Sequence, residues 1–121
     1  MPTPSYVLLY VASPPASEAF YARLLELKAV ESAPTFALFV MEGGFKLGLW
    51  LRGDVQPAAT GSAGAVELGF PLPGRAEVDR LHALWVTRGA VIAQAPQRLD
   101  FGYTFTATDP DGHRLRVFAP E

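Results

Sequence analysis

Few side chains in this sequence have the chemistry of a catalytic or metal-binding site. The 121 residues include no cysteine and two histidines, His82 and His113. Without cysteine there is no thiol nucleophile and no thiolate metal site, and a lone imidazole is a poor metal site. The segment Asp109-Pro-Asp-Gly112 brings two carboxylates together, but it lacks the third acidic position and the distal glutamate of a calcium-binding loop. We therefore expect a turn at this segment, a helix-surface imidazole at His82 and a turn residue at His113.

Charge and composition exclude further classes of function. Ten basic and twelve acidic residues give a formal net charge of −2, and no run of Lys or Arg occurs. Clustered cations are what nucleic-acid binding requires, so no nucleic-acid partner is expected. No phosphate loop, dinucleotide fingerprint or Gly-x-Ser-x-Gly elbow is present. The longest apolar run, residues 6–12, is far shorter than the about 20 residues of a membrane helix. The N-terminus lacks the features of a signal peptide, so we expect a cytoplasmic protein with no membrane partner.

The elements that must position these side chains follow the same order twice. In the first half, the apolar residues 6–11 predict a strand buried on both faces, and Ser13-Pro14 predicts the start of a helix over about 15–27. A short strand is expected near residues 29–32. The glycines of Glu42-Gly-Gly44 predict a hairpin between strands at 35–41 and 45–51.

The second half repeats this order after a connector of small and turn-forming residues. Its predicted helix covers residues 77–88, with Val78, Leu81 and Trp85 on one face, and Gly89 is expected to end it. The predicted strands of this half are 65–71, 91–93, 101–108 and 114–118. We therefore predict an α+β fold in which 1–121 form one domain of two βαβββ modules, at about 5–55 and about 65–120, joined by a linker at 56–64.

Two segments carry a family resemblance. The first is Ala19–Leu25 with its Phe-Tyr pair, and the second is Phe101–Arg116, in which Asp-Pro-Asp-Gly leads into the last strand. With the duplicated order, these segments resemble the vicinal oxygen chelate superfamily, which includes glyoxalase I, extradiol dioxygenases, fosfomycin-modifying enzymes and bleomycin-resistance binding proteins. The resemblance covers residues 6–120. It implies a glyoxalase/bleomycin resistance/dihydroxybiphenyl dioxygenase-like fold, in which the modules line one cup, and it implies a homodimer. It does not choose a function, because the superfamily spans several chemistries.

The resemblance also implies four inward-facing positions where metal-dependent members carry His, Glu or Gln. Here these positions fall on Tyr6, Gly48, Glu67 and Arg116. Glycine has no donor, arginine is permanently cationic and accepts no hydrogen bond, and tyrosine ligates only as a phenolate. Glu67 is the one good ligand, whereas a catalytic metal needs about three protein ligands. We therefore predict no metal site, no cofactor and no catalytic residue.

Strand alternation predicts which side chains face the cup. Because the first and last strands of each module are neighbours in this fold, Glu67 and Arg116 are expected to form a charge-assisted pair. That pair is either a structural ion pair that plugs the vacated metal position or an anchor that orients a ligand. Trp50, Phe101, Tyr103 and Phe105 are candidates for an aromatic wall. The predicted ligand-binding residues are Tyr6, Leu8, Tyr10, Gly48, Trp50, Glu67, Phe101, Tyr103, Arg116 and Phe118.

Three functions remain open at this point. The favoured one is metal-independent binding of a small organic molecule, similar in plan to bleomycin-resistance proteins. The second is an enzyme in which Glu67 is a general base and Arg116 holds an anionic substrate, although the arginine would lower the pKa of that base. Metal-dependent glyoxalase or dioxygenase chemistry ranks lower still. The third is a dimerisation module with a vestigial cup.

Overall fold

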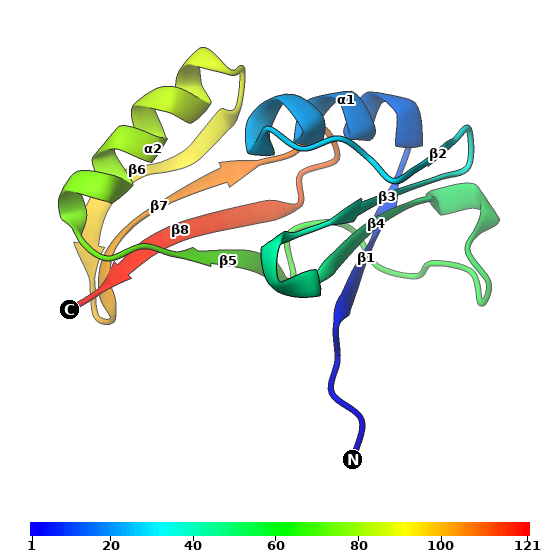
Figure 1. Ribbon diagram of the computed structural model, residues 1–121, viewed down its shortest axis with the longest axis horizontal. Coiled ribbons are helices and arrows are strands. Elements are labelled where there is room, and N and C mark those ends of the chain that lie inside the picture. The colour runs from blue at the N-terminus through cyan, green and yellow to red at the C-terminus, as the bar shows by residue number, and fades with distance from the viewer. The chain divides into compact units, whose positions relative to one another are not determined.

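The computed structural model describes residues 1–121, which divide into two units, Met1–Gly61 (unit 1) and Ser62–Glu121 (unit 2). In each unit a strand, a helix and three further strands follow one another, and the strands form a four-stranded sheet with the helix on one face (Figure 1). The predicted α+β fold with two βαβββ modules is therefore confirmed. The shared cup and the homodimer stay predictions.

In unit 1 the sheet has the strand order β1-β4-β3-β2. Its elements are β1 (Tyr6–Val11), α1 (Pro14–Leu25), β2 (Glu31–Ala33), β3 (Phe36–Val40) and β4 (Lys46–Leu51), with short 3-10 turns at Glu42–Gly44 and Arg52–Asp54. The first strand runs parallel to β4, and the other neighbours are antiparallel. The predicted hairpin turn lies between β3 and β4, where Gly43 and Gly44 both adopt a positive φ.

Helix α1 begins as the sequence predicts. Ser13 is its N-cap and accepts a hydrogen bond from the backbone N–H of Ala16, and a proline follows at the first helical position. The helix ends at Glu26, which has left-handed φ and ψ angles. Its Phe20, Tyr21 and Leu24 are buried and form the core of unit 1 together with one face of the sheet.

The first strand departs from its prediction, which had both faces buried. Leu9 and Val11 are buried, but Tyr6, Leu8 and Tyr10 are 54%, 45% and 36% exposed. The unit has one helix, and α1 contacts the sheet on one side only, so the alternate side chains of β1 lie on an uncovered face. We call the sheet face away from the helix the open face of each unit.

In unit 2 the sheet has the corresponding order β5-β8-β7-β6, with β5 parallel to β8. Its elements are β5 (Glu67–Pro71), α2 (Arg75–Thr87), β6 (Val91–Leu99), β7 (Gly102–Thr108) and β8 (Arg114–Pro120). Trp85 and Val78 of α2 are buried, whereas Leu81 is half-buried. Gly89 has a φ of 87° just after the helix, as a terminating glycine requires. No helix of the protein combines the length and apolar character needed to cross a membrane.

The sixth strand is much longer than the three residues predicted for it. It continues to Leu99 and pairs with β7 through two irregularities of register, one on either side of Gln94. Each irregularity places an extra residue on β6, as in a β-bulge. The alternation of apolar and polar residues is interrupted at such points, which is why the sequence pattern ended the strand too early.

Candidate functional site

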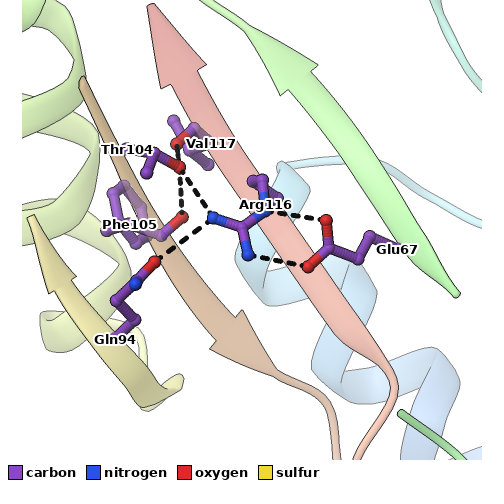
Figure 2. A network of polar contacts seen from close by, with 6 residues as sticks. All are labelled: Glu67, Gln94, Thr104, Phe105, Arg116 and Val117. Carbon is purple, nitrogen blue, oxygen red and sulfur yellow. Dashed lines mark hydrogen bonds and ion pairs between the residues drawn. The ribbon is translucent and has the colours of Figure 1, made fainter. Parts of the chain in front are cut away.

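The predicted pair on the open face of unit 2 is present. Arg116 Nε donates to Glu67 Oε1 at 2.7 Å, and Arg116 Nη2 donates to Glu67 Oε2 at 2.8 Å. Figure 2 shows the guanidinium plane and the carboxylate facing one another across β5 and β8. Such a bidentate, charge-assisted contact uses both carboxylate oxygens. The arginine side chain is 18% exposed and the glutamate side chain 34%.

Arg116 is held from its other side by two neutral side chains. Its Nη1 group donates to Gln94 Oε1 and to Thr104 Oγ1, both at 3.2 Å (Figure 2). The Thr104 hydroxyl is completely buried and donates in turn to the carbonyl of Val117 at 2.8 Å. The guanidinium thus makes four hydrogen bonds. Its position is fixed by residues of all four strands of the unit 2 sheet.

Two aromatic rings lie beside this network. The guanidinium carbon of Arg116 is 5.7 Å from the centre of the Phe101 ring, within the range of a cation–π contact. Phe101 also makes an edge-to-face contact with Phe118, with ring centroids 6.0 Å apart. The open face of unit 2 therefore brings together Glu67, Phe101, Arg116 and Phe118, as the sequence predicted.

The electrostatics of this pair disfavour an acid–base role. The hydrogen bond from Arg116 lowers the pKa of Glu67 below its ordinary value. Partial burial acts to raise this pKa, whereas the positive charges of Arg116 and Arg114 lower it further. A carboxylate with a lowered pKa is a weaker base near neutral pH. The geometry therefore stabilises Glu67 as an anion rather than as a group that exchanges protons.

The open face of unit 1 is apolar and aromatic. The register pairs Leu8 with Gly48 and Tyr10 with Trp50, so these residues share one face as predicted. Tyr10 and Trp50 make an edge-to-face contact with ring centroids 6.1 Å apart. The ammonium of Lys46 lies 5.0 Å from the centre of the Tyr6 ring. This face offers ring surface and the cation of Lys46, and Glu31 lies on the same face at the edge strand β2.

The space beside Gly48 is occupied by neighbouring side chains. A Cβ atom at this position would lie 2.6 Å from Leu8 Cδ2 and 3.1 Å from the Phe36 ring. The two side chains thus occupy the space into which a metal-binding side chain would project. In unit 2, both oxygens of Glu67 are already engaged by Arg116. These residues do not fit a divalent metal at the positions where the family resemblance implies one, and the chain has no group of three or more His, Asp or Glu side chains able to hold an ion.

Tyr103 and Phe105 lie on the other face of the sheet from the one predicted. The ring of Phe105 packs against Trp85 of α2, and the hydroxyl of Tyr103 donates to Asp79 of the same helix at 2.8 Å. Their prediction assumed a strand that starts at Phe101. Gly102 lies between, with a φ of +150° and no room for a Cβ beside Ala119, so Phe101 is outside the regular alternation of β7.

The two histidines and the aspartate turn lie away from the open faces. His82 lies on α2, as predicted, and is half-buried, with its ring 5.2 Å from that of Phe105. Asp109 Oδ1 accepts the backbone N–H groups of Asp111 and His113, both at 2.9 Å. The predicted turn is confirmed, and its carboxylate is used within the turn.

Sequence reasoning missed Gln94 and Thr104, which hydrogen-bond to the guanidinium of Arg116, and Thr106, the register partner of Arg116 on β7. Thr104, Thr106 and Thr108 alternate along β7, and that alternation was a signal for a polar face. Gln94 gave no such signal, because the irregularities of β6 determine which way it points.

Comparisons with known proteins agree with this architecture. A family model described as "Glyoxalase/Bleomycin resistance protein/Dioxygenase superfamily" matches residues 3–117. The chain is 30% identical over 118 residues to the phenazine antibiotic resistance protein EhpR of Enterobacter agglomerans, covering 95% of this chain and 90% of that protein.

Solved structures give the same picture. A protein of Agrobacterium tumefaciens, studied by NMR, is 50% identical with a TM-score of 0.90, and the match covers 100% of this chain and 99% of that one. A glyoxalase-related enzyme of Fulvimarina pelagi is 22% identical with a TM-score of 0.85, over 98% of this chain and 88% of that one. The second likeness concerns the fold alone.

Proposed function

The chain belongs to the Glyoxalase/Bleomycin resistance protein/Dioxygenase superfamily, and from this premise we propose that it binds a small aromatic molecule without a metal ion. The observation that carries the proposal is the bidentate Glu67–Arg116 contact. This contact occupies Glu67, which is the only good metal ligand among the four positions where metal-dependent relatives carry donor side chains. What remains on the open faces is ring surface with a few polar groups, the mixture that small-molecule sites use.

The aromatic residues favour a flat ligand. Tyr6 and Tyr10 are exposed, and Trp50 lies partly exposed beside Tyr10. Exposed rings that are already held by neighbours lose little freedom when another ring stacks on them or meets their edges. The relative from Enterobacter agglomerans is named for resistance to a phenazine antibiotic, a fused aromatic heterocycle. We therefore take phenazines as the first class of ligand to test.

The test is calorimetric titration of the purified protein with phenazine, before and after treatment with a chelator, together with elemental analysis. We expect binding that the chelator does not change, and no transition metal in equimolar amount. Trp50→Ala should weaken binding about three- to tenfold, since an aromatic contact contributes about 0.5–1.5 kcal/mol beyond its buried area.

Tyr103→Phe is the matched control, because Tyr103 contacts Asp79 on the helix side of the unit 2 sheet. Its affinity should equal that of the unmodified protein. An equimolar metal whose removal abolishes binding would contradict the proposal, and so would a complete absence of binding to phenazines.

A further inference from the structure

The hydroxyl of Thr106 is an unexplained polar group on the open face of unit 2. The residue is 2% exposed, and its Oγ1 atom has no hydrogen-bond partner. Buried hydroxyl groups are almost always paired, since an unpaired one loses its hydrogen bonds to water without replacement. The side chain lies on the same face as Thr104 and Arg116, because β7 pairs with β8 in unbroken register.

Two long polar side chains flank this hydroxyl. Thr106 is the register partner of Arg116 on β8 and of Gln94 on β6. The side chains of Arg116 and Gln94 hydrogen-bond to one another across the intervening strand, at 3.2 Å (Figure 2). Neither of these two side chains hydrogen-bonds to the Thr106 hydroxyl.

The chemistry of arginine fixes the direction of the Gln94 amide. Arginine has five N–H donors and no acceptor, so the oxygen of the amide must face Arg116 and the Nε2 group must point elsewhere. That group makes no hydrogen bond within the chain. An irregularity of register lies on each side of Gln94, and such bulges re-aim a side chain. An amide N–H donor and a hydroxyl that can both donate and accept are thus neighbours on this face, and the hydroxyl itself is covered.

The charge of this region selects a neutral partner. Glu67 compensates the charge of Arg116 through two hydrogen bonds, and two further Arg116 donors are occupied by Gln94 and Thr104. An anionic group placed here would meet a compensated guanidinium and the carboxylate of Glu67. Arg114 lies two residues earlier on β8 and is exposed to solvent, where its field is screened.

We propose that Gln94 and Thr106 form a polar subsite within unit 2, which hydrogen-bonds a neutral carbonyl or amide group of an aromatic ligand whose ring lies against Phe101 and Phe118 of the same unit. On binding, the Gln94 side chain moves aside to uncover the Thr106 hydroxyl, its amide donates to the carbonyl oxygen, and the hydroxyl pairs with the same group. This inference deepens the proposed function and rests on it. According to this inference, the substituent on the ring decides which flat aromatic ligands the protein binds most tightly.

The test compares three probes: phenazine, phenazine-1-carboxamide and phenazine-1-carboxylate. We expect the unmodified protein to bind the carboxamide most tightly. Thr106→Val, which replaces the hydroxyl by a methyl group of similar shape, should weaken carboxamide binding about three- to tenfold, as expected for the loss of one hydrogen bond. The same variant should leave phenazine binding unchanged. Thr106→Ser keeps the hydroxyl and should retain the preference, and Thr108→Val is the matched control on the same strand.

A measurement on the ligand-free protein keeps the two proposals distinguishable. Because the Thr106 hydroxyl has no partner, Thr106→Val should melt at the same temperature as the unmodified protein or at a higher one. A clear fall in melting temperature, absent in Thr108→Val, would mean that the hydroxyl is satisfied within the fold and would overturn the inference. So would tighter binding of the carboxylate, or equal loss of all three probes in Thr106→Val. Failure of all three probes to bind the unmodified protein would instead contradict the proposed function.

Discussion

The open faces of the two units have the same strand order but different surfaces. In unit 1 the neighbouring positions on the first and last strands are Leu8 and Gly48, and in unit 2 they are Gly69 and Arg116. Each pair combines one glycine with one long side chain, but the strands that carry them are exchanged. Where the long side chain comes from the first strand, the face is apolar, and where it comes from the last strand, the face carries a polar network.

This exchange shows how one topology yields two kinds of surface. The side chain opposite each glycine takes a different course. Leu8 occupies the space beside Gly48 in unit 1 together with Phe36, and Arg116 extends toward Glu67 and Gln94 in unit 2. The comparison therefore predicts that unit 2 derives stability from its open face, whereas unit 1 keeps its open-face rings exposed.

Arg116→Ala should have the largest effect. It removes four hydrogen bonds and leaves Glu67 without its partner, so we expect a loss of about 2–3 kcal/mol in the free energy of unfolding. Chemical denaturation of Arg116→Ala, Glu67→Ala and the double variant measures the coupling between the two residues. Strictly additive losses would mean that the pair contributes nothing as a pair, and the contrast between the two faces would fail.

A pair of glycine substitutions gives the next largest effect. At Gly48 a Cβ atom would lie 2.6 Å from Leu8 and 3.1 Å from Phe36, so Gly48→Ala should cost about 1–2 kcal/mol, moderated by the freedom of the exposed Leu8. At Gly69 the Cβ atom would meet only Phe118, at 3.4 Å, which is an ordinary contact. Gly69→Ala should be neutral or slightly stabilising. Equal melting temperatures for the two variants would contradict the difference in packing between Gly48 and Gly69.

The smallest effect concerns pH. Because Arg116 lowers the pKa of Glu67 in the folded state, the contribution of the ionised pair is complete above the unfolded-state pKa near 4.5 and is lost as the pH falls through the lower folded value. The glutamate side chain is 34% exposed, so we expect about 1 kcal/mol or less.

Melting curves of the unmodified protein and Glu67→Gln should therefore differ by a constant amount between pH 7 and about pH 5.5 and converge below about pH 4.5. Glu121 also has a lowered pKa, caused by Arg75, but both proteins contain it, so its effect cancels in the difference. A difference that grows on acidification would contradict the assignment.

Sequence reasoning predicted the duplicated order of elements from local patterns, and it predicted the Glu67–Arg116 contact by adding the strand order that the family resemblance implies. Capping residues, glycine turns and strand alternation act within a few residues, and a parallel pair of strands then brings the two charged residues together. It failed where one residue shifts the alternation. Gly102 separates Phe101 from Tyr103, and the irregularities of β6 decide the direction of Gln94.

The exposure of β1 was missed for a different reason. An apolar strand is typical of a sheet covered on both sides. The sequence of Tyr6–Val11 is equally apolar on its two faces, but only Leu9 and Val11 lie against the helix side of the sheet. Composition alone does not distinguish a ring that belongs to the core from one that is available to a ligand.

The Leu8–Gly48 contact also constrains how such a protein can change over evolutionary time. A coordinating side chain at residue 48 would crowd Leu8, so we expect it to appear more readily after residue 8 has become smaller. In unit 2, replacing only one of Arg116 and Glu67 leaves the charge of the other without its partner, so the two codons are expected to change together or not at all. Descendants of this sequence are therefore expected to diversify through the rings of unit 1 long before they acquire a metal site.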